Sequence, residues 1–550
     1  MDAFCEAAMI KLRFIPILCL LAVSIMGQGF EDLRSKSKIA ATPHNLMMNR
    51  DVLMLDSVLV DFSLCRSCHV PNKAIAVEPL WYRKISIPRF DINKEIDSGN
   101  EHVHTLDPGS RNCLSCHDGS MARSFPHRGD QKHPQVNLTA PEVQAPANYN
   151  MHLFNFPQSG KEISRPAESS KLMLTSQNQV GCITCHDPHN NEKGHFLRVS
   201  NKGSEICMEC HHMQNWELST HGNPQNPLHA VLEEVACLQC HSIHTLPTNA
   251  KLLKADENTL CLTCHDGRAD EDTEIASIKN LEEVFEKPFT HPIRINPNVT
   301  DVGYDSDTDS PWNFGLADDR FVRCGDCHNP HAVTEKNISP VLDGSLAFVE
   351  GVDAIGFKKD QVDYEYEVCY KCHGQNQNVN PGNDVARLLS VGNRSFHPIE
   401  SVGLSQRVPS LKDGWSEQSL ITCSDCHGND DPYGPQGPHG SSLPHILKAS
   451  YSDFPYASID EQELCFKCHD QRKITGNDGF KFHNLHINRA GYSCSACHNP
   501  HGSVDSPGLI DLNQSHITSL NGEKKVEGLE PGHGTCTLMC HDAKHLRDVY

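Results

Sequence analysis

Twelve short motifs, each with two cysteines and a histidine directly after the second, run along this 550-residue chain and contain all but two of its 26 cysteines. The twelfth, Cys536-Cys540-His541, has one additional residue between its cysteines. Two thiols at this spacing form thioethers to the edge of a haem, and the following histidine binds the iron. The motifs therefore predict about twelve covalent c-type haems with these histidines as proximal ligands. The eleven regular motifs are Cys65-Cys68-His69, Cys113-Cys116-His117, Cys182-Cys185-His186, Cys207-Cys210-His211, Cys237-Cys240-His241, Cys261-Cys264-His265, Cys324-Cys327-His328, Cys369-Cys372-His373, Cys423-Cys426-His427, Cys465-Cys468-His469 and Cys494-Cys497-His498.

Other cysteine-rich proteins share only part of this pattern. A zinc ribbon uses Cys-x-x-Cys pairs, and a disulfide scaffold uses an even number of cysteines. Neither needs a histidine directly after the second cysteine of every pair. A thioredoxin-like redox motif is a single pair in a βαβ context. The pattern therefore favours haem attachment over all three alternatives.

The two remaining cysteines, Cys5 and Cys19, lie in an N-terminal leader. Basic residues precede an apolar run at residues 14–26, and small residues follow it. This order is typical of a secretory signal peptide, which we predict at residues 1–29. No later apolar stretch is long enough for a membrane span, so we expect a mature chain without a transmembrane segment. We expect export to the periplasm or to the outer, extracellular surface of a bacterium, because c-type haem is attached outside the cytoplasmic membrane.

Charge and composition narrow the choice of partner and fold. The chain has 48 basic and 70 acidic residues, a net charge of −22. Nucleic acid is disfavoured as a partner, because phosphate binding needs the opposite sign. Only 38% of the residues are hydrophobic and 6% aromatic, too few for one large protein core. We expect haems to form the apolar core, surrounded by mostly irregular chain with short α-helices and little β-structure, and the haem-free chain to be largely unfolded.

The twelve motifs group into six pairs. Within the pairs, the first cysteines are 48, 25, 24, 45, 42 and 42 residues apart. An internal repeat of this kind predicts an extended array of two-haem units. Segments between the pairs are rich in Pro, Asn, Asp and Gly and are typical of loops. The predicted haem-pair domains are residues 30–150, 151–220, 221–285, 286–385, 386–475 and 476–550.

Further histidines recur at fixed places and are candidate sixth, or distal, iron ligands. In most pairs one lies three residues after the first motif, usually behind a proline that fixes the backbone, and an insertion displaces it in the fifth pair. Another lies upstream of most pairs. These positions predict two histidine ligands for each iron, the distal one supplied from elsewhere in the same repeat. The candidates after a first motif are His189, His244, His331, His439 and His501, and the upstream candidates are His152, His229, His291, His397, His483 and His486.

The first pair departs from this pattern. Three residues after His69 the chain has Asn72 where other pairs have a histidine. The distal ligand of this iron is then His102, His104 or His44, or its sixth position is open. The first site is therefore the candidate for an exchangeable iron.

At this point the sequence resembles a known group, the bacterial multihaem c-type cytochromes of the doubled CXXCH class. The resemblance covers about residues 60–545 as repeated units. It implies electron transfer in anaerobic respiration, in the periplasm or at the outer surface, often in metal-reducing bacteria. The segments that carry it are residues 182–197, 205–211, 237–265, 324–373, 79–81 and 113–119.

Three functions are compatible with this sequence. The leading hypothesis is a dodecahaem carrier that conducts electrons by hopping between haems, with other redox proteins as partners, such as periplasmic cytochromes or an outer-membrane porin–cytochrome complex, or with a metal oxide or other extracellular acceptor. The second is a redox enzyme for nitrogen or sulfur compounds, with the first haem open. No motif has the lysine that marks the catalytic haem of several multihaem reductases. The third is a structural subunit of a cytochrome filament or an outer-membrane conduit.

Overall fold

The computed structural model describes part of the chain, which divides into two units. The first unit comprises residues 1–212 and 232–254, and the second comprises residues 213–231 and 255–550. The leader predicted at residues 1–29 lies outside the described residues. The described residues are 39, 42, 44, 68–69, 91–97, 100–105, 107–114, 162–175, 178–223, 236–241, 243–244, 252–267, 278–293, 322–374, 384–452, 463–528, 534–540 and 543–549.

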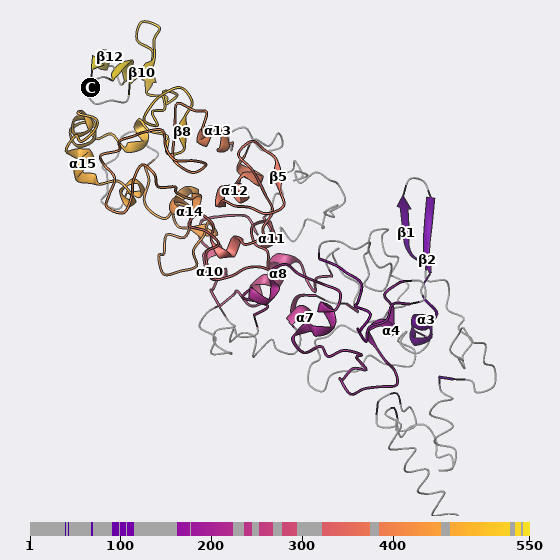
Figure 1. The fold of residues 1–550 in the computed structure, drawn as a ribbon. Coiled ribbons are helices and arrows are strands. Elements are labelled where there is room, and N and C mark those ends of the chain that lie inside the picture. The colour runs from indigo at the N-terminus through magenta and orange to yellow at the C-terminus, as the bar shows by residue number, and fades with distance from the viewer. Residues whose placement is uncertain are drawn as a thin grey trace, which may run out of the picture. The chain divides into compact units, whose positions relative to one another are not determined.

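In the first unit, short helices alternate with irregular chain (Figure 1). Strands β1 (Asp91–Asp97) and β2 (Asn100–Thr105) form an antiparallel hairpin in which Glu95 lies opposite His102. Most of the helices contain part of a cysteine motif, so the motifs and the regular structure coincide. The helices are α3 (Pro108–Leu114), α4 (Cys182–Cys185), η3 (Lys202–Ser204), α5 (Glu205–Met208) and α7 (Ala236–Cys240).

The second unit has the same character. Its α-helices are α8 (Glu257–Leu262), α10 (Glu282–Phe285), α11 (Cys324–Cys327), α12 (Glu365–His373), α13 (Ala386–Leu389), α14 (Cys423–Cys426) and α15 (Gln471–Thr475). Single turns of other helix types are η4 (Trp216–Leu218), η5 (Gly344–Leu346), η7 (Pro444–Ile446), η8 (Leu464–Lys467), η9 (Leu485–Arg489) and η10 (Cys494–Ala496). Its strands are β3 (Phe289–Thr290), β4 (Gly351–Val352), β5 (Lys358–Lys359), β6 (Ser395–Phe396), β7 (Gly440–Ser441), β8 (Gly502–Ser503), β9 (Ile517–Thr518), β10 (Lys525–Glu527), β11 (Thr535–Cys540) and β12 (Ala543–Val549).

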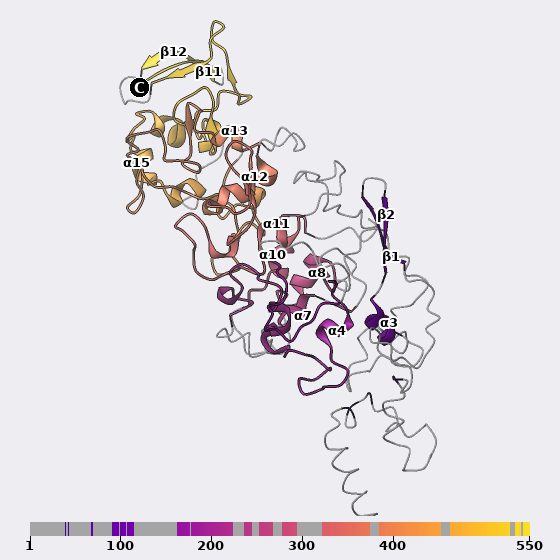
Figure 2. The same ribbon diagram turned by 45° about the vertical axis from the view of Figure 1, so that its right-hand side comes forward.

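The strands of the second unit form small antiparallel sheets. Two of these sheets join segments that are far apart in the chain: β3 pairs with β7, and β6 pairs with β8. The hairpin β4–β5 is local. Near the C-terminus β11 pairs with β10, β12 and β9, and these strands are yellow in Figure 2. The long-range sheets matter most for function, since each ends beside two of the candidate ligand histidines.

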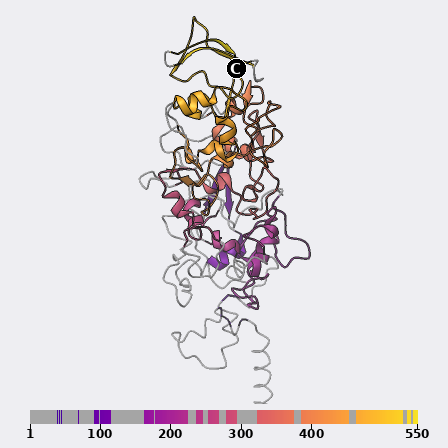
Figure 3. The same cartoon turned by 90° about the vertical axis from the view of Figure 1, so that its left-hand side faces the viewer.

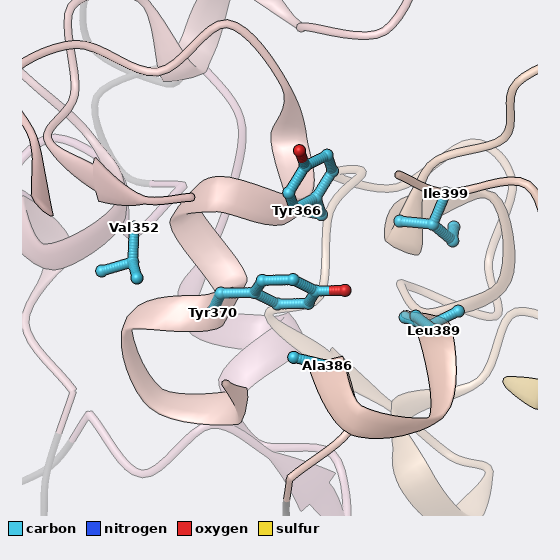
Figure 4. Close-up of a cluster of buried hydrophobic side chains, with 6 residues drawn as sticks. All are labelled: Val352, Tyr366, Tyr370, Ala386, Leu389 and Ile399. Carbon is cyan, nitrogen blue, oxygen red and sulfur yellow. The ribbon is translucent and has the colours of Figure 1, made fainter. Parts of the chain in front are cut away.

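Buried hydrophobic side chains gather around α12 in the second unit. Tyr366 and Tyr370, one helical turn apart, contact a cluster that is shown in Figure 4. Val368, on another side of α12, belongs to a second cluster with Leu342, Val349 and Val362. The Tyr370 hydroxyl donates a hydrogen bond of 2.7 Å to the Glu400 carboxylate. The first cluster consists of Val352, Tyr366, Tyr370, Ala386, Leu389 and Ile399.

The fold class predicted from the sequence is confirmed. The described chain is mostly irregular, with short helices and small strands (Figures 2 and 3). In the described ranges, no helix has both the length and the apolarity that crossing a bilayer requires. An irregular chain of this composition needs another source of apolar contact area, which agrees with cofactors as a main part of the core.

Candidate haem-binding sites

Eight of the nine regular motifs that the structure describes in full form one tight turn, and the ninth, Cys369-Cys372-His373, lies at the end of α12. The amide of the motif histidine donates to the carbonyl of the first cysteine, four residues earlier, at 2.9–3.1 Å. This turn keeps both thiols and the histidine on one short stretch of backbone, which is what attachment to a single haem edge needs. The described cysteines are all free thiols, so no disulfide competes for them. The histidines with this bond are His186, His211, His241, His265, His328, His427, His469 and His498.

The proximal imidazoles are oriented by hydrogen bonds at their Nδ1 atoms. In four motifs Nδ1 lies 2.8 Å from a backbone carbonyl oxygen of the loop that follows. In a fifth, Nδ1 of His469 lies 2.9 Å from the Ser410 hydroxyl. A metal-binding histidine usually donates its second N–H in this way, which directs Nε2 at the metal. The four carbonyl pairs are His186–His195, His328–Ser345, His427–His445 and His498–Gly508.

A second imidazole lies opposite many of the proximal ones. The ring centres of these pairs are 5.9–6.4 Å apart. A metal ion bound by two imidazoles, with metal–nitrogen bonds of about 2 Å, places the ring centres about 6 Å apart. The residues present therefore fit an iron between two histidines. The pairs are His69–His189, His186–His244, His328–His439, His427–His501, His498–His483 and His373–His291.

The distal histidines come from a different place than the sequence predicts. His189 follows the third motif, but its ring lies opposite His69 of the first motif. In the same way, His244 of the third pair faces His186 of the second. His439 and His501 repeat this shift in the second unit. The prediction of a distal ligand from the same repeat is wrong for these four sites, where the next pair supplies the ring.

This shift changes the picture of the first site. The ring opposite His69 is His189, at 6.0 Å. His44, an alternative from the sequence, instead stacks on Phe196 with ring centres 4.1 Å apart. His102 lies on β2, and nothing is described of its side chain. Asn72 lies outside the described residues, and the ring that faces His69 comes from the next pair.

The same hydrogen bond recurs beside three of the candidate distal histidines and joins neighbouring haem pairs. His291 follows β3 and His439 precedes β7, and Nδ1 of His291 lies 2.7 Å from the carbonyl oxygen of Pro438. His397 has the same contact with Pro500, beside His501 and the β6–β8 pair. Nδ1 of His221 lies 2.8 Å from the carbonyl oxygen of Pro330, beside His331. We call this hydrogen bond, from an upstream histidine to the proline before a distal histidine, the histidine–proline contact.

Glycine is required directly after two of these distal histidines. A Cβ atom at Gly440 would clash with the backbone oxygen of Val284, and one at Gly502 would clash with that of Leu388. At these positions β7 lies against the backbone of α10 and β8 against that of α13, so a side chain at either glycine would displace the strand beside the histidine.

The upstream histidines lie near the proximal histidines of second motifs. His291 faces His373 at 6.4 Å. Burial lowers the pKa of His469 to about 4, and the nearby His397 contributes. Burial also lowers the pKa of His265, and the nearby His221 contributes to this shift. His221 is not among the candidate ligands that the sequence predicts. No proline or motif marks it, and only its place upstream of the third pair could have indicated a ligand.

Burial keeps the distal imidazoles neutral. It lowers the pKa of His439, His483 and His501 to about 4 in each case. Neutral imidazole is the form that binds metals, so these rings need no deprotonation at physiological pH.

The cysteine thiols show which motifs are neighbours. In each haem pair except the last, the first cysteine of the second motif is hydrogen-bonded to the first cysteine of the following haem pair. This hydrogen bond is the main cause of the raised pKa of the cysteine in the second motif. Motifs of different pairs are therefore in direct contact within each unit. These thiol pairs are Cys113–Cys182, Cys207–Cys237, Cys261–Cys324, Cys369–Cys423 and Cys465–Cys494.

Motifs of the same pair are neighbours through other thiols. Burial raises the pKa of Cys185 to about 11, with a contribution from Cys210. Burial raises the pKa of Cys426 to about 11, with a smaller contribution from Cys468. The same holds for Cys327 near Cys369 and for Cys497 near Cys540, where burial raises each pKa to about 12. In the second unit, neighbouring motifs thus follow one another without interruption from the sixth to the twelfth.

Polar side chains fasten the contacts between pairs. The amide of Cys182 donates to the Ser110 hydroxyl at 2.9 Å, and that of Cys237 donates to Ser204 at 3.0 Å. Cys324 uses Asn258 in the same way, at 2.9 Å. Between the eighth and ninth motifs, buried Glu365 accepts from the amide and hydroxyl of Ser424. These bonds satisfy amides at the start of the motif turns, which lack partners within the turn.

The twelfth motif differs from the others. Cys536 and Cys540 lie in β11, where residues four apart share a face and are separated by about 13 Å, unlike cysteines within one turn. On β12, His545 lies opposite Leu538, and its ring is 6.3 Å from His486. His541 lies outside the described residues. The extra residue therefore accompanies a change of local structure from turn to strand.

Some predicted ligands are not tested by this geometry. His331 is described, with its ring 6.0 Å from that of Trp216. The predicted site residues outside the described part are Cys65, Cys116, His117, His152, His229 and His541.

Comparisons with known proteins agree with this description over part of the chain. The family model for the doubled CXXCH motif matches residues 176–215 and 229–270. The model for cytochrome c-type protein NrfB-like matches residues 423–518. A search of curated proteins finds no match to the chain. With the motifs and the paired imidazoles, the two models support a multihaem c-type cytochrome that binds covalent haem c and transfers electrons.

Proposed function

We propose that the chain carries about twelve covalent haems, each with its iron between two histidines, and conducts electrons from haem to haem. The observation that carries this proposal is the set of imidazole pairs with ring centres 5.9–6.4 Å apart. When bound, each c-type haem supplies a one-electron redox centre. Two fixed imidazoles keep the coordination unchanged between oxidation states. The protein's part is then to hold the ligands and the spacing of the sites.

The neighbouring thiols support conduction along the chain. Since thioethers form at the haem edge, contact between the cysteines of different motifs brings haem edges close together. This holds both within and between pairs, for example at Cys369 beside Cys423 and at Cys426 beside Cys468. A storage protein would not need consecutive contacts of this kind, whereas a carrier does.

A redox enzyme needs an iron with an exchangeable position. The sequence offered only the first haem for this role, because of Asn72. The imidazole of His189, 6.0 Å from His69, favours a six-coordinate first iron and so a carrier. We propose anaerobic respiration or extracellular, metal-directed electron transfer as its setting, because the motifs resemble those of bacterial multihaem cytochromes with these roles.

We further propose export to the periplasm or the cell surface. The leader pattern at residues 1–29 and the requirement for haem attachment outside the cytoplasm support it. Periplasmic cytochromes, porin–cytochrome partners or a metal oxide are the proposed redox partners. N-terminal sequencing of the mature holoprotein tests export: a start near residue 30 supports it, and a start at Met1 or Met9 contradicts it.

The carrier function is tested by reoxidation of the reduced holoprotein. We expect a soluble ferric chelate to reoxidise it, with about twelve electrons released per chain. Nitrite, hydroxylamine and sulfite, each tested separately, should show no catalytic turnover. Sustained turnover of any of the three would replace the carrier with the enzyme.

A further inference from the structure

We propose that Ser395 lowers the reduction potential of the haem on the eleventh motif, by strengthening the hydrogen bond that its proximal ligand His498 donates. The inference rests on the proposed function and deepens it, because it names a residue outside the ligand set that tunes one haem. Ser395 lies on β6, in the segment of the preceding haem pair, and no motif marks it.

A single peptide group links the serine to the ligand. The carbonyl oxygen of this group, from Gly508, lies 2.8 Å from Nδ1 of His498. Its N–H, from Leu509, donates a hydrogen bond of 2.9 Å to the hydroxyl oxygen of Ser395. A histidine that binds a metal through Nε2 carries its other proton on Nδ1 and donates it. The ligand and the serine therefore bind opposite ends of the same peptide group.

The Ser395 hydroxyl extends this row of hydrogen bonds by one step. It donates at 2.7 Å to the carbonyl oxygen of Ser506. The row ends there, because the next residue, Pro507, has no N–H. Each group in the row accepts one hydrogen bond and donates the next in the same direction. Hydrogen bonds arranged in this way polarise and strengthen one another.

The surroundings make this polarisation effective. Ser506 is 1% exposed and Ser395 is 9% exposed, so little water competes for their polar atoms. A hydrogen bond is electrostatically stronger in such a site than in water. Gly508 and Leu509 have φ angles of 62° and 59°, a left-handed conformation that is uncommon for leucine. With this backbone conformation, the loop presents its carbonyl to His498 and its N–H to Ser395.

The chain also contains a similar strand pair without this serine. At the position that Ser395 has in the β6–β8 pair, the β3–β7 pair has Phe289, which has no polar side-chain atom. Nδ1 of His427 still lies 2.8 Å from a carbonyl oxygen, that of His445. The ninth site therefore has the imidazole–carbonyl bond, but no hydroxyl at this strand position.

The direction of the effect follows from the basicity of the ligand. When the Leu509 N–H donates to Ser395, the Gly508 oxygen becomes more negative and accepts more strongly from His498. A stronger hydrogen bond at Nδ1 makes the imidazole a better electron donor, which favours ferric iron and lowers the potential. Nδ1 of His483, the ring opposite His498, has no hydrogen-bond partner among the described residues. The tuning of this iron thus acts through His498.

The test uses full-length holoproteins with Ser395→Ala, Ser395→Thr, Ser395→Val and a control, Ser503→Ala. Threonine and valine have nearly the same shape and differ in the hydroxyl. Ser503 is a matched control, because it is 8% exposed, lies opposite Ser395 and donates instead to the carbonyl oxygen of Ile510. The measurements are a redox titration followed by electron paramagnetic resonance, hydrogen exchange at the Leu509 amide, and the haem content of the peptide that contains the eleventh motif.

We expect Ser395→Ala and Ser395→Val to raise the potential of one haem. The ferric-to-ferrous ratio of that haem should change about threefold, which is about 28 mV at about 59 mV per tenfold change. Both variants should also speed exchange at the Leu509 amide, which loses its acceptor. Ser395→Thr should match wild type in both measurements, and Ser503→Ala should leave the potential unchanged.

Two results would overturn the inference while the proposed function stands. One is an equal potential for the threonine and valine variants, and the other is an equal shift in Ser503→Ala. If the peptide with the eleventh motif carries no haem in wild type, the proposed function fails at this site, and the inference fails with it.

Discussion

Because the next haem pair supplies the distal histidine, His501→Ala should have a specific effect on a haem of the preceding pair. In sequence His501 belongs to the eleventh motif, three residues after His498. In the structure its ring is parallel to that of His427 in the ninth motif, with an interplanar angle of 2° and ring centres 6.2 Å apart. His498 already faces another ring, His483, at 6.4 Å. The substitution should therefore open the iron held by Cys423 and Cys426, and leave the iron of its own motif six-coordinate.

The size of the effect follows from the number of motifs. One iron of twelve should become high-spin, and the ferrous protein should bind one carbon monoxide per chain. The lost low-spin signal should be a rhombic one, since parallel imidazole planes give that spectrum. His291→Ala should instead remove a strongly anisotropic signal, because the planes of His291 and His373 meet at 54°. Quantitative electron paramagnetic resonance of the holoprotein measures both losses.

A second substitution identifies which iron is opened. Removal of the ninth attachment site by Cys423→Ala and Cys426→Ala should abolish the carbon monoxide binding that His501→Ala creates. His483→Ala with His501→Ala should open two irons, since the two rings serve different haems. If His501→Ala instead opens the haem of the eleventh motif, the claim that His501 serves an iron of the preceding pair is refuted.

Three further predictions follow from other described contacts. Leu389→Ala should lower the free energy of unfolding by about 2–5 kcal/mol in urea titrations, because Leu389 is only 2% exposed, whereas Val391→Ala, at a site 53% exposed, should change it little. Burial raises the pKa of Asp430, but hydrogen bonds from the Lys287 ammonium and the Ser442 amide outweigh it and lower the pKa to about 2. Asp430→Asn should therefore remove about 2 kcal/mol of stability at pH 7, a contribution that wild type keeps above pH ~4 and loses as the pH falls through 2, and a flat difference between the two proteins from pH 7 to 2 would contradict this. His189→Ala should open the first iron to carbon monoxide, and an unchanged spectrum would restore His44, His102 or His104 as its ligand.

The sequence predicts the parts of this protein that are local. The turn of Cys182, Cys185 and His186 is specified by five consecutive residues, so its chemistry can be predicted without a structure. The fold class follows from composition, since few hydrophobic residues leave a large share of the core to haem. Short helices around the motifs agree with both arguments.

The sequence does not predict contacts between distant segments. His189 and His69 lie in different repeats, and periodicity alone cannot show that a ring serves the preceding pair. The local pattern at Asn72 predicts an unusual first iron, whereas the ring that faces His69 belongs to His189 of the next pair. His221 has no neighbouring proline, and its contact with the carbonyl oxygen of Pro330 is seen only in the structure.

The twelfth motif shows a conflict between two local signals. Its cysteines and histidine resemble those of the other motifs, which form a turn in the structure. The β-branched Thr535 and Thr537 favour a strand, and the structure has strand β11 at this place. Because Cys536 and Cys540 are one residue further apart, they are not held in the turn that the regular motifs form.

The most direct test of the account is a spin and ligand census of the wild-type holoprotein. Haem is counted per chain, and electron paramagnetic resonance and optical spectra are recorded, oxidised and reduced, with and without carbon monoxide or nitrite. The account predicts twelve haems per chain, all low-spin, with no change on addition of either ligand. A high-spin fraction near one in twelve that binds carbon monoxide or nitrite would contradict it, and would turn the first or the twelfth site into a candidate catalytic centre.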